Sequence, residues 1–128
     1  YYQEQLVRLT PESASAWFNL GFIQQQQNDH YGALENFQRA LALNATLDRA
    51  WYGQALSLVA IDRVDAAMMA LEQNIKLQPL SPHGYYQLGL LQARLGEEEA
   101  LTTTVAKLKR FSPQFAHQLS CETQQNCL

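Results

Sequence analysis

The sequence predicts an all-α fold, an α-solenoid built from antiparallel helix-turn-helix repeats. The first observation is a period of 34 residues, which relates Trp17, Trp51 and Tyr85. The second is that three more columns keep this spacing: Phe18, Tyr52 and Tyr86; Gly21, Ala55 and Gly89; Phe22, Leu56 and Leu90. Fixed periods of this length are typical of arrays in which each helical unit completes the apolar core of its neighbour.

The period divides the chain into units without a gap. Starting each unit three residues before its aromatic anchor gives repeats at 14–47, 48–81 and 82–115. We interpret residues 1–13 as the end of a preceding repeat helix, and residues 116–128 as a capping helix followed by a polar tail. Pro79 and Pro113 share one column and are expected to end second helices, since proline lacks the amide hydrogen that a helix needs.

In the first repeat, Asn28 and Asp29 are predicted to separate two helices, and Asp29 to cap the second by accepting from its free amides. That second helix carries an apolar stripe of helical period: Ala33, Leu34, Phe37, Ala40 and Leu41. The second repeat has the clearest stripe, formed by Val64, Ala67, Met68, Leu71 and Ile75.

The third repeat begins with Ser81 and Pro82, a cap residue followed by a proline at the first helical position. Its second helix is degenerate. Leu101 falls in the column of Ala33 and Ala67, and the run 102–104 consists of threonines, which are poor helix formers.

Composition and charge exclude several classes of function. The chain has 128 residues, 47% of them hydrophobic, and a net charge of −3. Its cations are scattered except between Lys107 and Arg110, so no basic surface suited to nucleic acid is expected. No apolar stretch approaches the length of a membrane span, so we expect no direct membrane contact in this piece. The chain begins at Tyr1, and anything upstream could have been removed.

No catalytic, metal or cofactor site is predicted. His30, His83 and His117 are too far apart in the repeat frame to share a metal ion, and no nucleophile-base pair or phosphate loop stands out. Cys121 and Cys127 could form a disulfide or remain two thiols. Both readings stay open, and the compartment with them: cytoplasm or periplasm, with a lean to an oxidising one if the cysteines are bridged.

These columns resemble the tetratricopeptide repeat family. The resemblance is carried by Trp17, Leu20, Gly21, Ala33, Phe37 and Ala40 in the first unit; by Trp51, Ala55, Ala67, Leu71 and Pro79 in the second; and by Tyr85, Leu88, Gly89 and Pro113 in the third. One departure is Gln54, which stands where the other units have leucine. The resemblance implies a right-handed superhelix with first helices lining its concave face, and a scaffold that binds peptides, helices or other proteins. Trp17 and Trp51 are expected to pack against neighbouring helices and not to contact a ligand.

The same resemblance suggests which residues line a partner-binding groove. They are Phe18, Asn19 and Phe22 in the first repeat; Arg49, Tyr52, Leu56 and Val59 in the second; and His83, Tyr86, Gln87, Leu90 and Arg94 in the third. This apolar strip predicts a partner protein or peptide with an apolar segment, with the arginines offering charge-assisted contacts. The alternative is that these residues pack against neighbouring first helices, or that another helix of the same protein fills the groove.

Two other functions remain open at this level. The chain could self-assemble through an apolar end, giving a homo-oligomer, or it could be the non-catalytic recruitment arm of an enzyme. A subgroup of the family grips chaperone carboxyl termini with Lys, Asn and Arg. The corresponding positions here are Phe18, Phe22, Gly53, His83 and Gln87, so we expect no such clamp.

Overall fold

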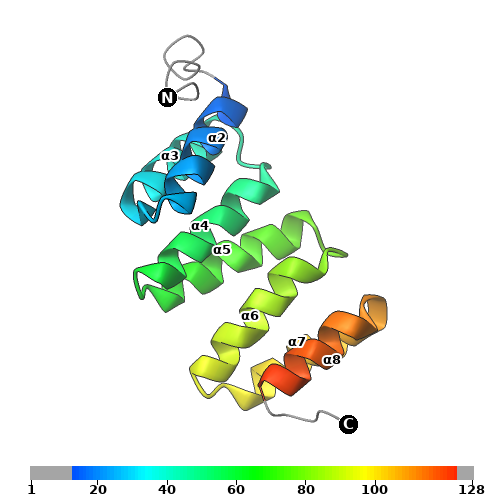
Figure 1. The fold of residues 1–128 in the computed structure, drawn as a ribbon. Helices are drawn as coiled ribbons and strands as arrows, with labels where there is room; N and C mark the ends of the chain where they lie inside the picture. The colour runs from blue at the N-terminus through cyan, green and yellow to red at the C-terminus, as the bar shows by residue number, and fades with distance from the viewer. Residues whose placement is uncertain (1–12, 124–128) are drawn as a thin grey trace. The chain divides into compact units, whose positions relative to one another are not determined.

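The computed structural model describes residues 13–123, and within this range it contains seven helices and no strand (Figure 1). The predicted all-α class is confirmed. The predicted helix end in residues 1–13 falls almost wholly outside the described residues. The helices are α2 (Ala14–Gln26), α3 (His30–Leu43), α4 (Asp48–Ala60), α5 (Val64–Leu77), α6 (Pro82–Arg94), α7 (Glu98–Phe111) and α8 (Pro113–Glu122).

The turn inside each helical hairpin has the same backbone geometry. Asn28, Asp62 and Gly96 all have positive φ, at 65°, 63° and 73°, and they stand 34 residues apart. After each of them, an amide reaches back to a carbonyl in the last turn of the first helix, as in Asp29 N to Gln24 O at 2.8 Å. This is the hydrogen-bond pattern of a Schellman ending, which asparagine, aspartate and glycine tolerate best.

The helix starts follow the sequence signals in part. The side chain of Asp29 accepts from the amide of Gly32 at 3.1 Å, so the predicted cap of α3 is confirmed. Ser81 is the residue before α6 and Pro82 begins it, although no side-chain cap bond forms there. Pro113 follows the end of α7 at Phe111 and also begins α8, three residues before the expected tail segment.

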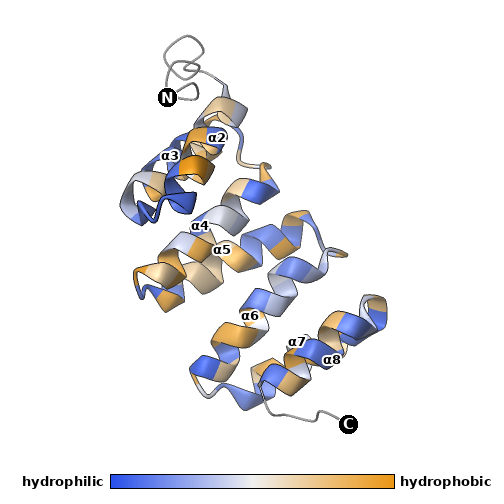
Figure 2. Cartoon of the chain, viewed as in Figure 1, coloured by the Kyte–Doolittle hydropathy of each residue, from blue (hydrophilic) through white to orange (hydrophobic). Residues whose placement is uncertain are grey.

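The described helices group into two compact units. The first ends at Leu77 and holds α2 to α5, and its core gathers around Phe37. A Cβ atom added to Gly21 or Gly53 would lie within 3 Å of the Phe37 ring, so both glycines let first helices approach α3 closely. Trp17 and Trp51 pack against this core, as predicted. Figure 2 shows hydrophobic residues interleaved with polar ones along each of these helices.

The second unit begins at Gln78 and holds α6, α7 and α8. Its core consists of Leu101, Leu108, Ala116 and Leu119. The three threonines of α7 are accommodated within the helix, where the hydroxyls of Thr102 and Thr103 donate to the carbonyls of Glu98 and Glu99, four residues earlier. Leu101 is buried, which supports the register given by gap-free counting.

Candidate functional site

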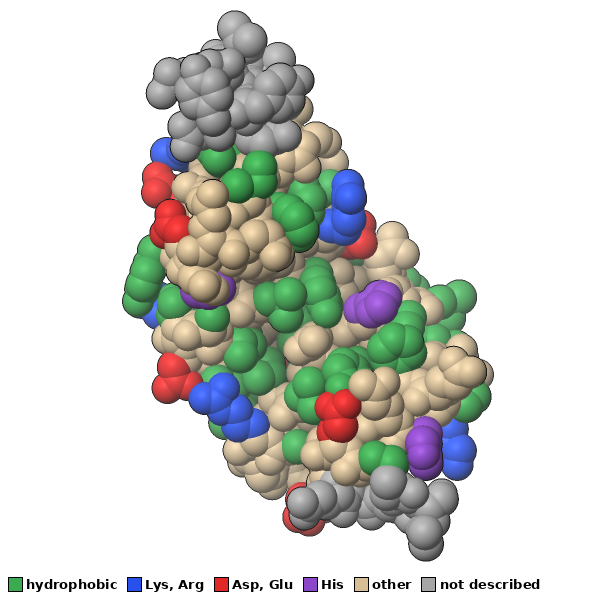
Figure 3. Space-filling model, in the orientation of Figure 1, with side chains coloured by type: hydrophobic (Ala, Val, Ile, Leu, Met, Phe, Trp, Pro, Cys, Tyr) green, Lys and Arg blue, Asp and Glu red, His purple; other side chains and the backbone are tan. Residues whose placement is uncertain are grey.

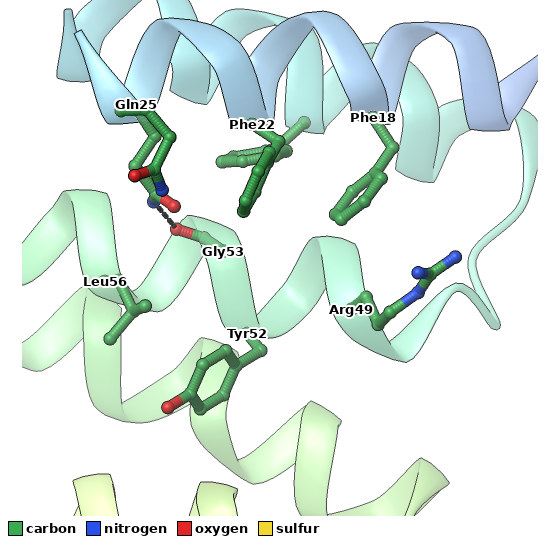
Figure 4. Close-up of a pocket in the computed structure, with 9 residues that line it drawn as sticks. Phe18, Phe22, Gln25, Arg49, Tyr52, Gly53 and Leu56 are labelled. Atoms are coloured by element: carbon green, nitrogen blue, oxygen red, sulfur yellow. Dashed lines mark hydrogen bonds between the residues drawn. The ribbon is translucent and has the colours of Figure 1, made fainter. Parts of the chain in front are cut away.

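A hollow between α2 and α4 is the candidate site of the first unit (Figure 4). We call it the α2–α4 hollow. Its volume of about 240 Å³ is smaller than a typical pocket for a drug-sized molecule but suits a side chain. It is lined mainly by apolar and aromatic groups: Phe18, Phe22, Gln25, Gln26, Phe37, Arg49, Tyr52, Gly53 and Leu56. On the face shown in Figure 3, hydrophobic side chains reach the surface of the protein.

The structure brings together five of the groove residues expected in this unit, namely Phe18, Phe22, Arg49, Tyr52 and Leu56. The other two lie away from the lining. Asn19 is exposed on α2 and Val59 is half-buried on α4. Phe37, which comes from α3 and also lines the hollow, was not among the expected groove residues, because its column indicated core packing alone.

The aromatic wall of the hollow is part of the core. Phe18 is only 9% exposed, and its ring centroid lies 5.7 Å from that of Phe37 and 6.3 Å from that of Phe22. Phe22 is 48% exposed, so the wall passes from core to solvent within one helical turn. The guanidinium of Arg49 lies over the Phe18 ring, with its carbon 5.1 Å from the centroid. Phe18 is thus a packing residue whose outer edge meets the hollow.

Hydrogen bonds of the Gln25 side chain hold α2 against α4 at the other end of the hollow. Gln25 donates from Nε2 to the carbonyl of Gly53 and to the hydroxyl of Ser57, both at 2.8 Å (Figure 4). His30 Nδ1 lies 3.2 Å from the same hydroxyl. Ser57 is fully buried, so this histidine-serine pair is a structural bond that a substrate could not reach. The Gln25 hydrogen bonds fix the spacing of the two helices that form the hollow.

In the second unit, the chain's own helix α8 covers part of the expected groove surface. The Phe115 ring meets His83 and Tyr86 edge-on, with centroids 5.4 Å and 5.8 Å apart. The Tyr86 hydroxyl donates to the carboxylate of Glu122, and this bond is the main reason that the pKa of Glu122 lies below its ordinary value of 4.5. This matches the alternative in which another helix of the protein fills the groove.

The remaining groove residues of this unit are divided between packing and solvent. Leu90 is half-buried and packs against the cluster that contains Leu119. Gln87 is half-buried, and Arg94 is exposed at the end of α6.

One family model matches part of the chain. Residues 14–47 match the family model described as tetratricopeptide repeat. The chain contains a tetratricopeptide repeat in this range, in agreement with the predicted resemblance. The matched range holds α2 and α3, the helical hairpin that supplies the Phe18, Phe22 and Phe37 side of the hollow. No curated protein matches the chain.

Solved structures show the same fold over nearly the whole chain. Two crystal structures of MamA are each 21% identical to it and cover 96% of it, with TM-scores of 0.82 and 0.81; the chain covers 75% and 70% of theirs. The structure of the APC/C hetero-tetramer Cut9-Hcn1 is 20% identical and covers 95% of the chain, which spans 25% of that protein, with a TM-score of 0.85.

A second hollow of the first unit lies over α3, α4 and α5 and is called the α4–α5 hollow. It is lined by Gln38, Trp51, Gln54, Leu58, Arg63, Ala66, Met69, Ala70 and Gln73. Gln54, which stands where the other repeats have leucine, has a buried amide oxygen, and that atom has no hydrogen-bond partner among residues 13–123. Met69 is 68% exposed at the edge.

Between residues 13 and 123, no three His, Cys, Asp or Glu side chains are placed to hold one metal ion. Over the same range, none of the helices combines the length and apolar character of a membrane span. Cys121 Sγ lies 3.6 Å from His117 Nε2. Cys127 is outside the described residues, so its pairing with Cys121 stays a prediction.

Proposed function

We propose that the chain is a protein-interaction scaffold whose first unit binds an apolar segment of a partner protein in the α2–α4 hollow. The observation that carries the proposal is Phe22, a large aromatic side chain that is 48% exposed beside a concave apolar surface. Exposed apolar patches of this kind are favoured sites of interaction. Tyr52 and Leu56 extend the same surface along α4.

The shape of the hollow supports a side-chain anchor as the occupant. Its walls belong mainly to α2 and α4, which the Gln25 hydrogen bonds hold together at a fixed spacing, so the hollow is already formed before a partner arrives. A preformed site avoids the cost of ordering the scaffold on binding. Because the hollow is small and open, the partner would insert one apolar side chain and lay its backbone across the two helices.

The test is capture of partners from an extract of the source organism by the immobilised full chain, followed by mass spectrometry. We expect Tyr52→Ala combined with Leu56→Glu to abolish capture, because the pair removes an aromatic wall and places a charge in the hollow. Circular dichroism and melting should stay near those of the parent, since both side chains are only partly buried.

Met69→Glu is the matched control. It puts the same charge in place of an exposed apolar side chain of the same unit, but at the α4–α5 hollow. Capture that survives the Tyr52 and Leu56 changes but is lost with Met69→Glu would contradict the proposal and assign binding to the other hollow.

A further inference from the structure

Two arginines of the first unit lie over aromatic rings, and they differ in one respect. The Arg39 guanidinium lies 4.7 Å from the centroid of Trp17 and also donates to the carboxylate of Glu35 at 2.8 Å. Arg49 lies over Phe18 in a similar way, but over residues 13–123 no carboxylate lies within ion-pair distance of its guanidinium. Among the described residues, Arg39 thus has both an aromatic ring and an acidic partner, whereas Arg49 has the aromatic ring alone.

Arg49, the arginine without an acidic partner among the described residues, lies in the proposed binding site. It begins the lining of the α2–α4 hollow at the Phe18 end, whereas Gln25 lies toward the other end (Figure 4). Arg49 is the one charged residue among the nine that line the hollow, and none of the nine is acidic. The chain as a whole carries a net charge of −3, so the positive charge at this site is local.

We propose that the partner segment carries an Asp or Glu side chain beside its apolar anchor, and that Arg49 binds this carboxylate. The inference rests on the proposed function and adds the chemistry of the partner. A guanidinium presents its donors in a planar fork that matches a carboxylate, and its stacking on Phe18 limits the freedom lost when that bond forms. Phosphorylated segments are recognised by clusters of arginines, whereas a single arginine faces this hollow.

The experiment is selection of phage-displayed random dodecapeptides on the full chain and on four variants: Arg49→Gln, Arg49→Lys, Arg39→Gln and Leu56→Glu. We expect the parent to select peptides with an apolar residue near an Asp or Glu. Arg49→Gln should keep the apolar preference and lose the acidic one. Arg39→Gln, the matched control, should select as the parent does, because Arg39 already pairs with Glu35.

A synthetic peptide taken from the selection on the parent is then used to measure the contribution of its acidic residue to the binding affinity, by fluorescence anisotropy. Replacing its acidic residue by the corresponding amide should weaken binding to the parent about tenfold, as expected for one partly exposed charge-assisted hydrogen bond. The same replacement should leave binding to Arg49→Gln unchanged. For Arg49→Lys, the loss of affinity should lie between those of the parent and of Arg49→Gln, because lysine keeps the charge and lacks the planar fork of donors.

The outcomes separate the two proposals. An acidic preference that Arg49→Gln retains would overturn the role of Arg49 while leaving the hollow as the binding site. Peptides selected equally by the parent and by Leu56→Glu would contradict the hollow itself, and the inference with it. Absence of any enrichment on the parent would count against both. Circular dichroism of each variant identifies any change that comes from misfolding.

Discussion

The unpartnered amide oxygen of Gln54 leads to a prediction about the free energy of unfolding. Gln54 lines the α4–α5 hollow, and its amide oxygen is buried and lacks a hydrogen-bond partner within the described residues. Leaving a buried acceptor unpaired costs about 1–3 kcal/mol relative to its hydrated state. Leu20 and Leu88 occupy the same column of the other repeats, so the site accepts an apolar side chain of similar size. We therefore expect Gln54→Leu to stabilise the protein.

The expected gain is about 1–2 kcal/mol in the free energy of unfolding, below the upper limit of the desolvation cost because the rest of the Gln54 side chain is partly exposed. For a chain of this size the corresponding rise in melting temperature is about 3–6 °C per kcal/mol. Guanidinium unfolding followed by circular dichroism measures the first quantity and a thermal melt the second. The slope of the unfolding curve should not change.

Gln38→Leu is the control, since Gln38 lines the same hollow but is exposed. Its effect should stay within about 0.5 kcal/mol, as for ordinary surface changes. A neutral or destabilising Gln54→Leu, measured beside a neutral Gln38→Leu, would refute the reasoning, because it would mean that the amide of Gln54 is satisfied in solution.

Two further predictions concern one buried ring of the first unit and one exposed hydrogen bond of the second. Phe37→Ala should lower the free energy of unfolding by about 3–5 kcal/mol, since the ring is fully buried and fills the space beside Gly53; a loss below 1 kcal/mol by guanidinium unfolding would contradict this packing. The bond from Tyr86 lowers the pKa of Glu122 below 4.5, so it stabilises the folded state above this pH and the contribution is lost as the pH falls through the lowered pKa. Urea unfolding from about pH 6 to about pH 3 should therefore show a steeper acid loss for the parent than for Tyr86→Phe, and equal slopes would exclude the coupling.

Local signals in the sequence predicted the helical hairpins well. Asn28 and Asp29 mark a turn because one accepts a left-handed backbone and the other caps the following helix, and both effects act within a few residues. The 34-residue period transfers the same turn to Asp62 and Gly96. The apolar columns predicted which faces are buried, as Phe37 and Leu71 show.

The polar contacts between helices were not predictable in this way. Asn36 donates to Gln24 inside the first repeat, and Thr104 donates to Gln92 at 2.7 Å at the equivalent place in the third. The middle repeat has Leu58 and Ala70 in these columns, so no polar pattern repeats through the chain. A pair of this kind becomes visible only when both helices have been placed.

The amino-acid sequence by itself determined the fold class, the period and the identity of the aromatic strip, because these depend on spacing along one chain. Only the tertiary structure decided which members of the strip form a hollow. It packed Phe37 against Phe18 and set Arg49 over the Phe18 ring, whereas in the second unit it packed Phe115 against Tyr86. The physical reason is that a helical period identifies an apolar face, while the element that covers this face is set by packing between distant segments.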